Sequence, residues 1–203
     1  MRPIPRAALV ALMGLILSPP PPACAEQPSA ARDSAHSRKL SSRVAAQQAT
    51  QELRLRLDAL HKVGIAAKRT AHADLQSAIR RRKQLLLNLL EDYPEVLLET
   101  AVPDEVRHRI PTDLQNELEQ PVAADGTLTV IIADDFTRGT SKRSDTLTTE
   151  EGNQLSLHFV EHPPEFLTGD HVGVQGLGLE SHVVLPTSDG SSRFARPALS
   201  KGR

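Results

Sequence analysis

The chain has 203 residues, enough for one ordinary domain or two small ones, and only 2% of them are aromatic. Aliphatic side chains must therefore supply nearly all of a modest core, and a single cysteine excludes a disulfide framework. The net charge of −1 conceals a division. Residues 32–83 carry thirteen Lys or Arg against four Asp or Glu, whereas residues 84–203 carry nine against twenty. Such asymmetry indicates that the halves attract each other or that the basic half meets an acidic partner.

The first 25 residues have the three parts of a secretory signal peptide. Two arginines precede an apolar run over residues 7–17, and prolines and the small-residue site Ala23-Cys24-Ala25 follow. The run is too short for a stable membrane-spanning helix, so we expect cleavage after Ala25 and export to the periplasm or beyond, with no transmembrane anchor. Lipidation at Cys24 is an open alternative.

A polar spacer and a helical region come next. Residues 26–46 are rich in Ser, Ala, Gln and charge, which predicts a disordered spacer. Residues 47–120 form the predicted helical region, in which apolar residues recur every three or four positions from Leu53 to Ile79. The pattern fits one long helix or a hairpin bent near Gly64 or around residues 70–74.

Four cations, Arg80, Arg81, Arg82 and Lys83, interrupt this region before a leucine cluster. The simpler interpretation is a solvated helix face, and the sharper one is a binding patch for anionic lipid or nucleic acid. Farther along, Pro94, Pro103 and Pro111 each suit a helix start. They predict two or three short helices before residue 118.

After residue 120 the apolar period changes from about 3.6 to 2. Residues 125–186 contain five alternating segments separated by turns, which predicts a small five-stranded antiparallel barrel of the OB type. The fold class is therefore α+β, with a helical N-terminal half and a small β-barrel. Residues 187–203 are polar and basic, and we expect a disordered tail there.

The glycine-rich stretch GDHVGVQGLGLE, residues 169–180, could cradle a phosphate or belong to a strand. A phosphate loop needs a helix directly after it, and the next residues, SHVVLP, have the pattern of another strand. Because the alternation changes parity at Gly176, we expect a curved strand with a β-bulge at that residue.

The candidate chemistry is sparse. His158, His162 and His171 are possible zinc ligands, but residues four apart on a strand are separated by roughly 13 Å, so we expect solvent-facing histidines instead. Asp134 and Asp135 are interpreted as strand-end turn residues. The barrel carries only three phenylalanines, and its acidic balance repels phosphate, so we expect no nucleic-acid partner and no cofactor.

Several motifs carry a family resemblance over about residues 84–185. They are the Pro-x-Glu-Val segment at 103–106, the strand end at 134–136, LHF at 157–159, PPEFLTG at 163–169 and V-x-V-x-G at 172–176. This part resembles the non-catalytic N-terminal region of secreted bacterial metallopeptidases of the gametolysin type and of related multidomain secreted proteins. The printed chain ends about where the zinc peptidase domain of such relatives would begin, so no catalytic or metal-binding residue is carried over.

The resemblance implies a secreted, non-enzymatic accessory or pro-region-like module that binds a protein partner, such as a metallopeptidase. One alternative is a stand-alone envelope protein whose basic helices bind anionic surfaces. The other is a zinc hydrolase that uses His158, His162 and His171.

Overall fold

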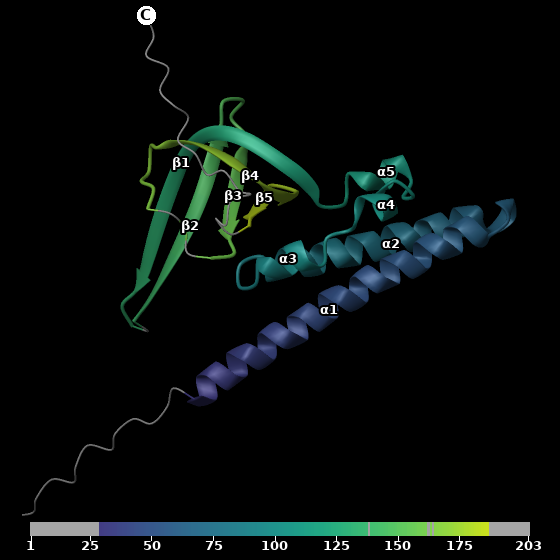
Figure 1. The fold of residues 1–203 in the computed structure, drawn as a ribbon, viewed down its shortest axis with the longest axis horizontal. Helices are drawn as coiled ribbons and strands as arrows, with labels where there is room; N and C mark the ends of the chain where they lie inside the picture. The colour runs from purple at the N-terminus through teal and green to yellow at the C-terminus, as the bar shows by residue number, and fades with distance from the viewer. Residues whose placement is uncertain (1–28, 138, 162, 164, 187–203) are drawn as a thin grey trace, which may run out of the picture.

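A computed structural model describes residues 29–137, 139–161, 163 and 165–186. The chain is α+β: helices occupy the N-terminal half, and a five-stranded mixed sheet follows (Figure 1). The predicted signal peptide, 1–25, and the predicted tail, 187–203, lie outside the described residues. Within the described part, no helix is both long and apolar enough to span a membrane.

Two long helices form an antiparallel hairpin, α1 over Ser29–Lys62 and α2 over Ile65–Leu89 (Figure 1). The chain leaves the helical conformation at Gly64, which confirms a bend at one of the two predicted places. The disordered spacer predicted over 26–46 is wrong from residue 29 onward, because α1 begins there. The early turns gain contacts that the local sequence does not reveal: Lys39 and Arg43 pair with Glu95 and Glu99.

Three short helices follow α2, as the prolines predicted. Helix α3 spans Glu95–Glu99, α4 spans Asp104–Arg107 and α5 spans Thr112–Gln115, and a proline immediately precedes each. Buried aliphatic residues of the hairpin pack against Val102, Ile110, Leu114 and Leu118 from this segment. The short helices therefore cover one side of the hairpin and bring the chain to the sheet.

The five strands lie where the alternation predicted them. Their bounds are β1 Gln120–Asp135, β2 Thr140–Thr149, β3 Gln154–Phe159, β4 His171–Leu179 and β5 His182–Leu185. The pairings close on one another in the order β1-β2-β3-β5-β4, because β1 pairs with β4 through its first half and with β2 through its second. We call this arrangement the closed sheet.

One strand pair corrects the all-antiparallel prediction, because β3 and β5 run parallel. After β3 the chain crosses to β4 on the far side of β5, and it turns back at Glu180, a residue with a positive φ of 56°. Strand β5 then fills the place between β3 and β4, antiparallel to β4 and parallel to β3. Nearest neighbours in sequence favour hairpins, so alternation alone does not reveal this crossing.

The β-bulge predicted at Gly176 is also wrong, because β4 pairs with β1 in continuous register through Gly176. The change of parity has a different cause: both faces of β4 are covered. Val172 and Val174 face the interior of the closed sheet, whereas Leu177 and Leu179 pack against the helices. Gly176 has an interior position where a Cβ would lie 2.3 Å from the carbonyl oxygen of Val184. The next element is a strand, which confirms that the glycines do not open a helix.

A joint core binds the two halves together. Its buried members from the helical side are Ala46, Leu86, Leu90, Val96 and Leu97, and those from the sheet are Leu179 and Val184. The sheet's own interior is a separate cluster that includes Leu128, Leu147 and Val172. The helical half and the closed sheet thus share one apolar contact, and polar groups surround it.

Candidate functional site

A hollow of about 900 Å³ lies beside the joint core. It is bounded by the end of α2, the segment leading into α3, and the outer sides of β2 and β3. Its wall includes Tyr93, Ser144, Ser156, His158 and His182. The hollow is therefore where the helical half and the closed sheet both present polar side chains.

Two histidines face each other on this wall. His158 lies near the end of β3 and His182 begins β5, and the two strands are parallel neighbours. The Nε2 atom of His158 is 3.0 Å from the Nδ1 atom of His182, within hydrogen-bond distance. The ring centroids are 5.2 Å apart, with the planes inclined by 34°. The sequence analysis predicted that His158 faces open solvent. This prediction is wrong, because His158 is partly buried against a second imidazole.

The surroundings of His158 favour its neutral form. Burial lowers the pKa of His158 below the usual histidine value, and the neighbouring His182 lowers it further. The carboxylate of Glu91 and a hydrogen bond to the backbone of Leu90 act in the opposite direction and raise this pKa. The net shift of the pKa is downward, so the ring is uncharged at neutral pH. One of its nitrogens can then accept a hydrogen bond.

Three ion pairs lie among the residues that line the hollow. Lys142 of β2 bonds to Glu91, and this contact lowers the pKa of Glu91. Arg143 reaches Asp145 at 2.8 Å, and the Asp145 side chain is nearly buried. Lys39 of α1 pairs with Glu95 at the start of α3. The lining thus carries paired charges of both signs, and Asp92 and Glu161 add two further carboxylates.

The predicted zinc ligands do not come together. His158 is on β3 and His171 begins β4, strands that are not neighbours in the sheet, and His162 lies outside the described residues. In the described ranges no group of three or more His, Cys, Asp or Glu could hold a metal ion. The sequence analysis missed His182, whose partner is set by the parallel β3–β5 register.

The four cations predicted as a solvated face or binding patch all have carboxylate partners. Arg80 and Lys83 pair with Glu117, Arg81 pairs with Glu52, and Lys83 also reaches Glu180. Arg82 is only 1% exposed. The basic and acidic halves therefore attract each other here, as one interpretation of the charge division proposed.

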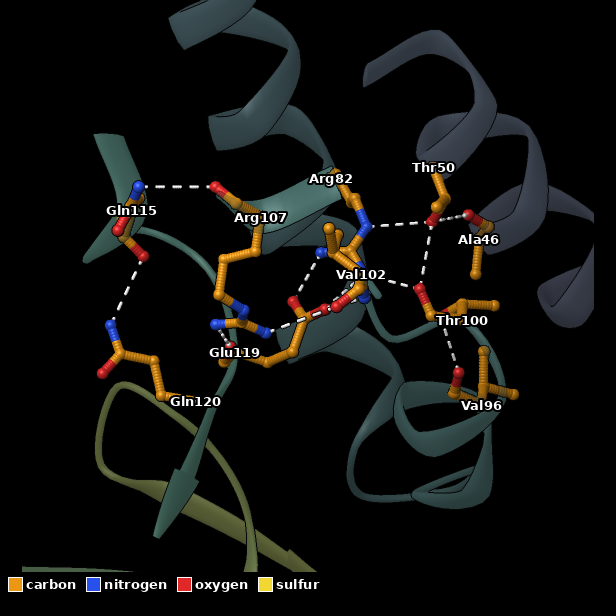
Figure 2. A network of polar contacts seen from close by, with 10 residues as sticks. All are labelled: Ala46, Thr50, Arg82, Val96, Thr100, Val102, Arg107, Gln115, Glu119 and Gln120. Carbon is orange, nitrogen blue, oxygen red and sulfur yellow. Dashed lines mark hydrogen bonds and ion pairs between the residues drawn. The ribbon is translucent and has the colours of Figure 1, made fainter. Parts of the chain in front are cut away.

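Arg82 is the centre of a buried polar network (Figure 2). Its guanidinium donates two hydrogen bonds, of 2.6 and 3.0 Å, to the carboxylate of Glu119, just before β1. It also donates to the Thr50 hydroxyl at 2.9 Å and to the Thr100 carbonyl at 2.8 Å. The Glu119 carboxylate accepts a further bond from the Val102 amide. The network ties both long helices to the start of the sheet.

A third feature is the free end of the β1–β2 hairpin, which we call the ribbon: residues 131–136 of β1 and its turn, with 140–144 of β2. Strand β1 pairs with β4 only as far as Thr127, so the ribbon has two strands (Figure 1). Its β2 strand borders the hollow, where Lys142 bonds to Glu91 of the helical half. Ile131, Ile132 and Phe136 are exposed on it, Phe136 to 91%. Leu167 is exposed on the adjoining loop, which bonds to Val130 through Thr168.

Comparison with family models, curated proteins and solved structures finds no match to this chain.

Proposed function

We propose that the chain is an exported, non-catalytic module that binds a protein partner, with the ribbon as the principal contact surface. The observation that supports it is the exposed apolar group Ile131, Ile132, Phe136 and Leu167. Single exposed apolar residues are ordinary. Here Ile131 and Ile132 put an exposed apolar side chain on each face of the ribbon, and Phe136 adds a third at its turn, so an apolar partner can bind on either face. The resemblance of residues 84–185 suggests a secreted metallopeptidase as the partner. The five strands of the closed sheet suggest a barrel of the OB type.

The ribbon has the means to bind an extended segment of such a partner. The edge of β1 is covered at Leu128 and Val130 by the loop that carries Thr168 and Asp170. Beyond Val130, the β1 register includes only β2. Exposed apolar side chains beside an incompletely paired strand edge favour addition of a partner strand.

The test is binding of the purified chain to a gametolysin-type metallopeptidase from the same organism, followed by calorimetry and by peptidase rate. We expect binding, with inhibition or altered activity, and weaker binding for Ile132→Ser with Phe136→Ser. The matched control is Leu55→Ser, because Leu55 is exposed on α1, away from the ribbon. Absence of any binding and any effect on the peptidase contradicts the proposal. Equal loss in the control contradicts the role of the ribbon.

A second candidate function is contact with an anionic envelope surface, and the tip of the helical hairpin favours it. Ile65 is 94% exposed there, and Lys62, Lys68 and Arg69 are exposed around it. An apolar side chain among cations suits an anionic membrane surface. The proposed membrane-binding residues are therefore those at the tip of the hairpin, and not Arg80–Lys83, which have carboxylate partners.

This second candidate is tested by sedimentation with vesicles of phosphatidylglycerol and, separately, phosphatidylcholine. Binding only to the anionic vesicles, weakened by salt and by Lys68→Gln with Arg69→Gln, supports it. Arg80→Gln with Arg81→Gln is the control and should bind as the unchanged chain does. No binding to anionic vesicles at low salt eliminates this candidate.

A further inference from the structure

We propose that His158 and His182 bind a divalent transition-metal ion of the Cu²⁺, Ni²⁺ and Zn²⁺ class, on the wall of the hollow. The proposal does not depend on the partner of the ribbon. It differs from the zinc site considered from the sequence, since it uses neither His171 nor His162. The argument rests on the separation of two nitrogen atoms, on the strands that hold them and on the space beside them.

The separation of the ring nitrogens fits a shared ion. Imidazole nitrogens lie about 2.0–2.1 Å from such metals, so two nitrogens at right angles around one ion are about 2.9 Å apart. The atoms Nε2 of His158 and Nδ1 of His182 are 3.0 Å apart in the structure. Both can therefore become ligands in adjacent positions if each ring turns its lone pair away from the other nitrogen toward a common ion, and the hydrogen bond between them is replaced by two metal–nitrogen bonds.

The two rings are held on rigid elements. In the parallel register His182 lies opposite Ser156 and His158 opposite Val184, so the histidines are diagonal neighbours on the outer face of the sheet. Val184 is fully buried in the joint core, and Leu185 and Val183 are buried in the sheet interior. A pair of ligands on paired strands keeps its spacing better than a pair on loops.

The remaining contacts of His158 suit a metal ligand. The His158 ring also interacts with the backbone of Leu90, as a metal-bound histidine often does with a backbone carbonyl, while its Nε2 atom faces His182. The carboxylate of Glu91 interacts with the ring and supplies negative charge near the ion.

The hollow leaves room for the other ligands. Its volume of about 900 Å³ accommodates several water molecules or a donor from a bound molecule. The described residues offer no third clustered ligand, so this is an open two-histidine site and not a closed structural zinc site. An open site binds less tightly, and its preference should follow the general order in which Cu²⁺ exceeds Ni²⁺ and Zn²⁺.

The test is calorimetric titration of the purified, metal-free chain with Cu²⁺, Ni²⁺ or Zn²⁺ alone at neutral pH. We expect one principal site, with affinity reduced about tenfold or more in His158→Gln and in His182→Gln. His171→Gln is the matched control, an exposed histidine of the same sheet, and should titrate like the unchanged chain. Paramagnetic resonance of the Cu²⁺ complex should show two coordinated nitrogens in the unchanged chain and one in each single variant.

Circular dichroism of each variant separates loss of the site from loss of the fold. If a variant unfolds, the resonance spectrum of the unchanged chain still decides, because it counts the imidazole ligands directly. The proposal is overturned if the chain binds none of the three ions, if both variants bind as well as the unchanged chain, or if the spectrum shows no imidazole pair.

Discussion

Two polar sites join the helical half to the closed sheet, and they differ in how their charges are satisfied. The network around Arg82 and Glu119 is buried, its charges cancel, and its donors have acceptors within the protein. The pair His158–His182 consists of two like groups, only partly buried, beside a hollow. The first arrangement has one stable protonation state. The second can change its proton or ligand state without a buried charge losing its partner, so we expect stability to depend mainly on the first site and metal binding on the second.

The largest expected effect breaks the first site. Arg82→Met keeps much of the side-chain volume but leaves the Glu119 carboxylate buried without its cation. Removing one partner of a buried ion pair typically costs about 3–5 kcal/mol, which urea unfolding should measure as a loss of unfolding free energy. The double variant Arg82→Met with Glu119→Leu should lose less than the sum of the single variants. If Arg82→Met lowers the unfolding free energy as little as the loss of an exposed ion pair does, the buried network does not stabilise the fold as proposed.

The next largest effect tests how closely β4 and β5 must pack beside the histidine pair. Gly176→Ala places a Cβ 2.3 Å from the carbonyl oxygen of Val184, on the strand that carries His182. Forcing strands apart in a packed core costs about 1–3 kcal/mol, measured by the same unfolding experiment. Gly64→Ser is the control, because nothing lies within 4 Å of a Cβ there and serine suits a helix N-cap. Unchanged stability in Gly176→Ala would show that β4 and β5 move apart easily.

A smaller effect is the change of folding stability with pH, which depends on the histidine pair and not on the network around Arg82. The pKa of His158 is lowered in the folded protein, mainly by burial, so on acidification the unfolded chain takes up this proton first. Folding stability should therefore fall as the pH drops below the usual histidine value of about 6.5. His158→Gln should flatten that part of the curve of melting temperature against pH, whereas His171→Gln should retain it. A variant with an unchanged slope would show that another group is responsible.

Most helices and strands could be predicted from the sequence, because they depend on the spacing of apolar residues over a short stretch of the chain. Alternation located all five strands, and the prolines located the three short helices. The start of α1 could not be predicted in this way. The polar residues before Gln47 make contacts with residues that are distant in the sequence: Lys39 and Arg43 pair with Glu95 and Glu99, and Ala46 is buried in the joint core.

The candidate site was less predictable, because it depends on register. The alternation made His158 an outward-facing residue, but only the parallel pairing of β3 and β5 brings His158 and His182 together. In the same way, Arg82 looks like its neighbours in a basic run, and only its partner Glu119 distinguishes it. Side-chain chemistry was visible in the sequence, whereas the partner of each side chain required the fold.

The smallest expected effect completes the comparison within that basic run. Arg80 pairs with Glu117 at 3.2 Å, but its side chain is 61% exposed, so water already solvates the charge and a partner adds little. Arg80→Gln should cost about 0–1 kcal/mol of unfolding free energy, and the cost should shrink further in high salt. Arg82→Met, two positions along the same helix, should keep most of its cost in salt because its charge pair is buried. If Arg80→Gln proved as destabilising as Arg82→Met, burial would not be what separates the two arginines. The stability of the joint would then depend on the summed surface charge of the two halves.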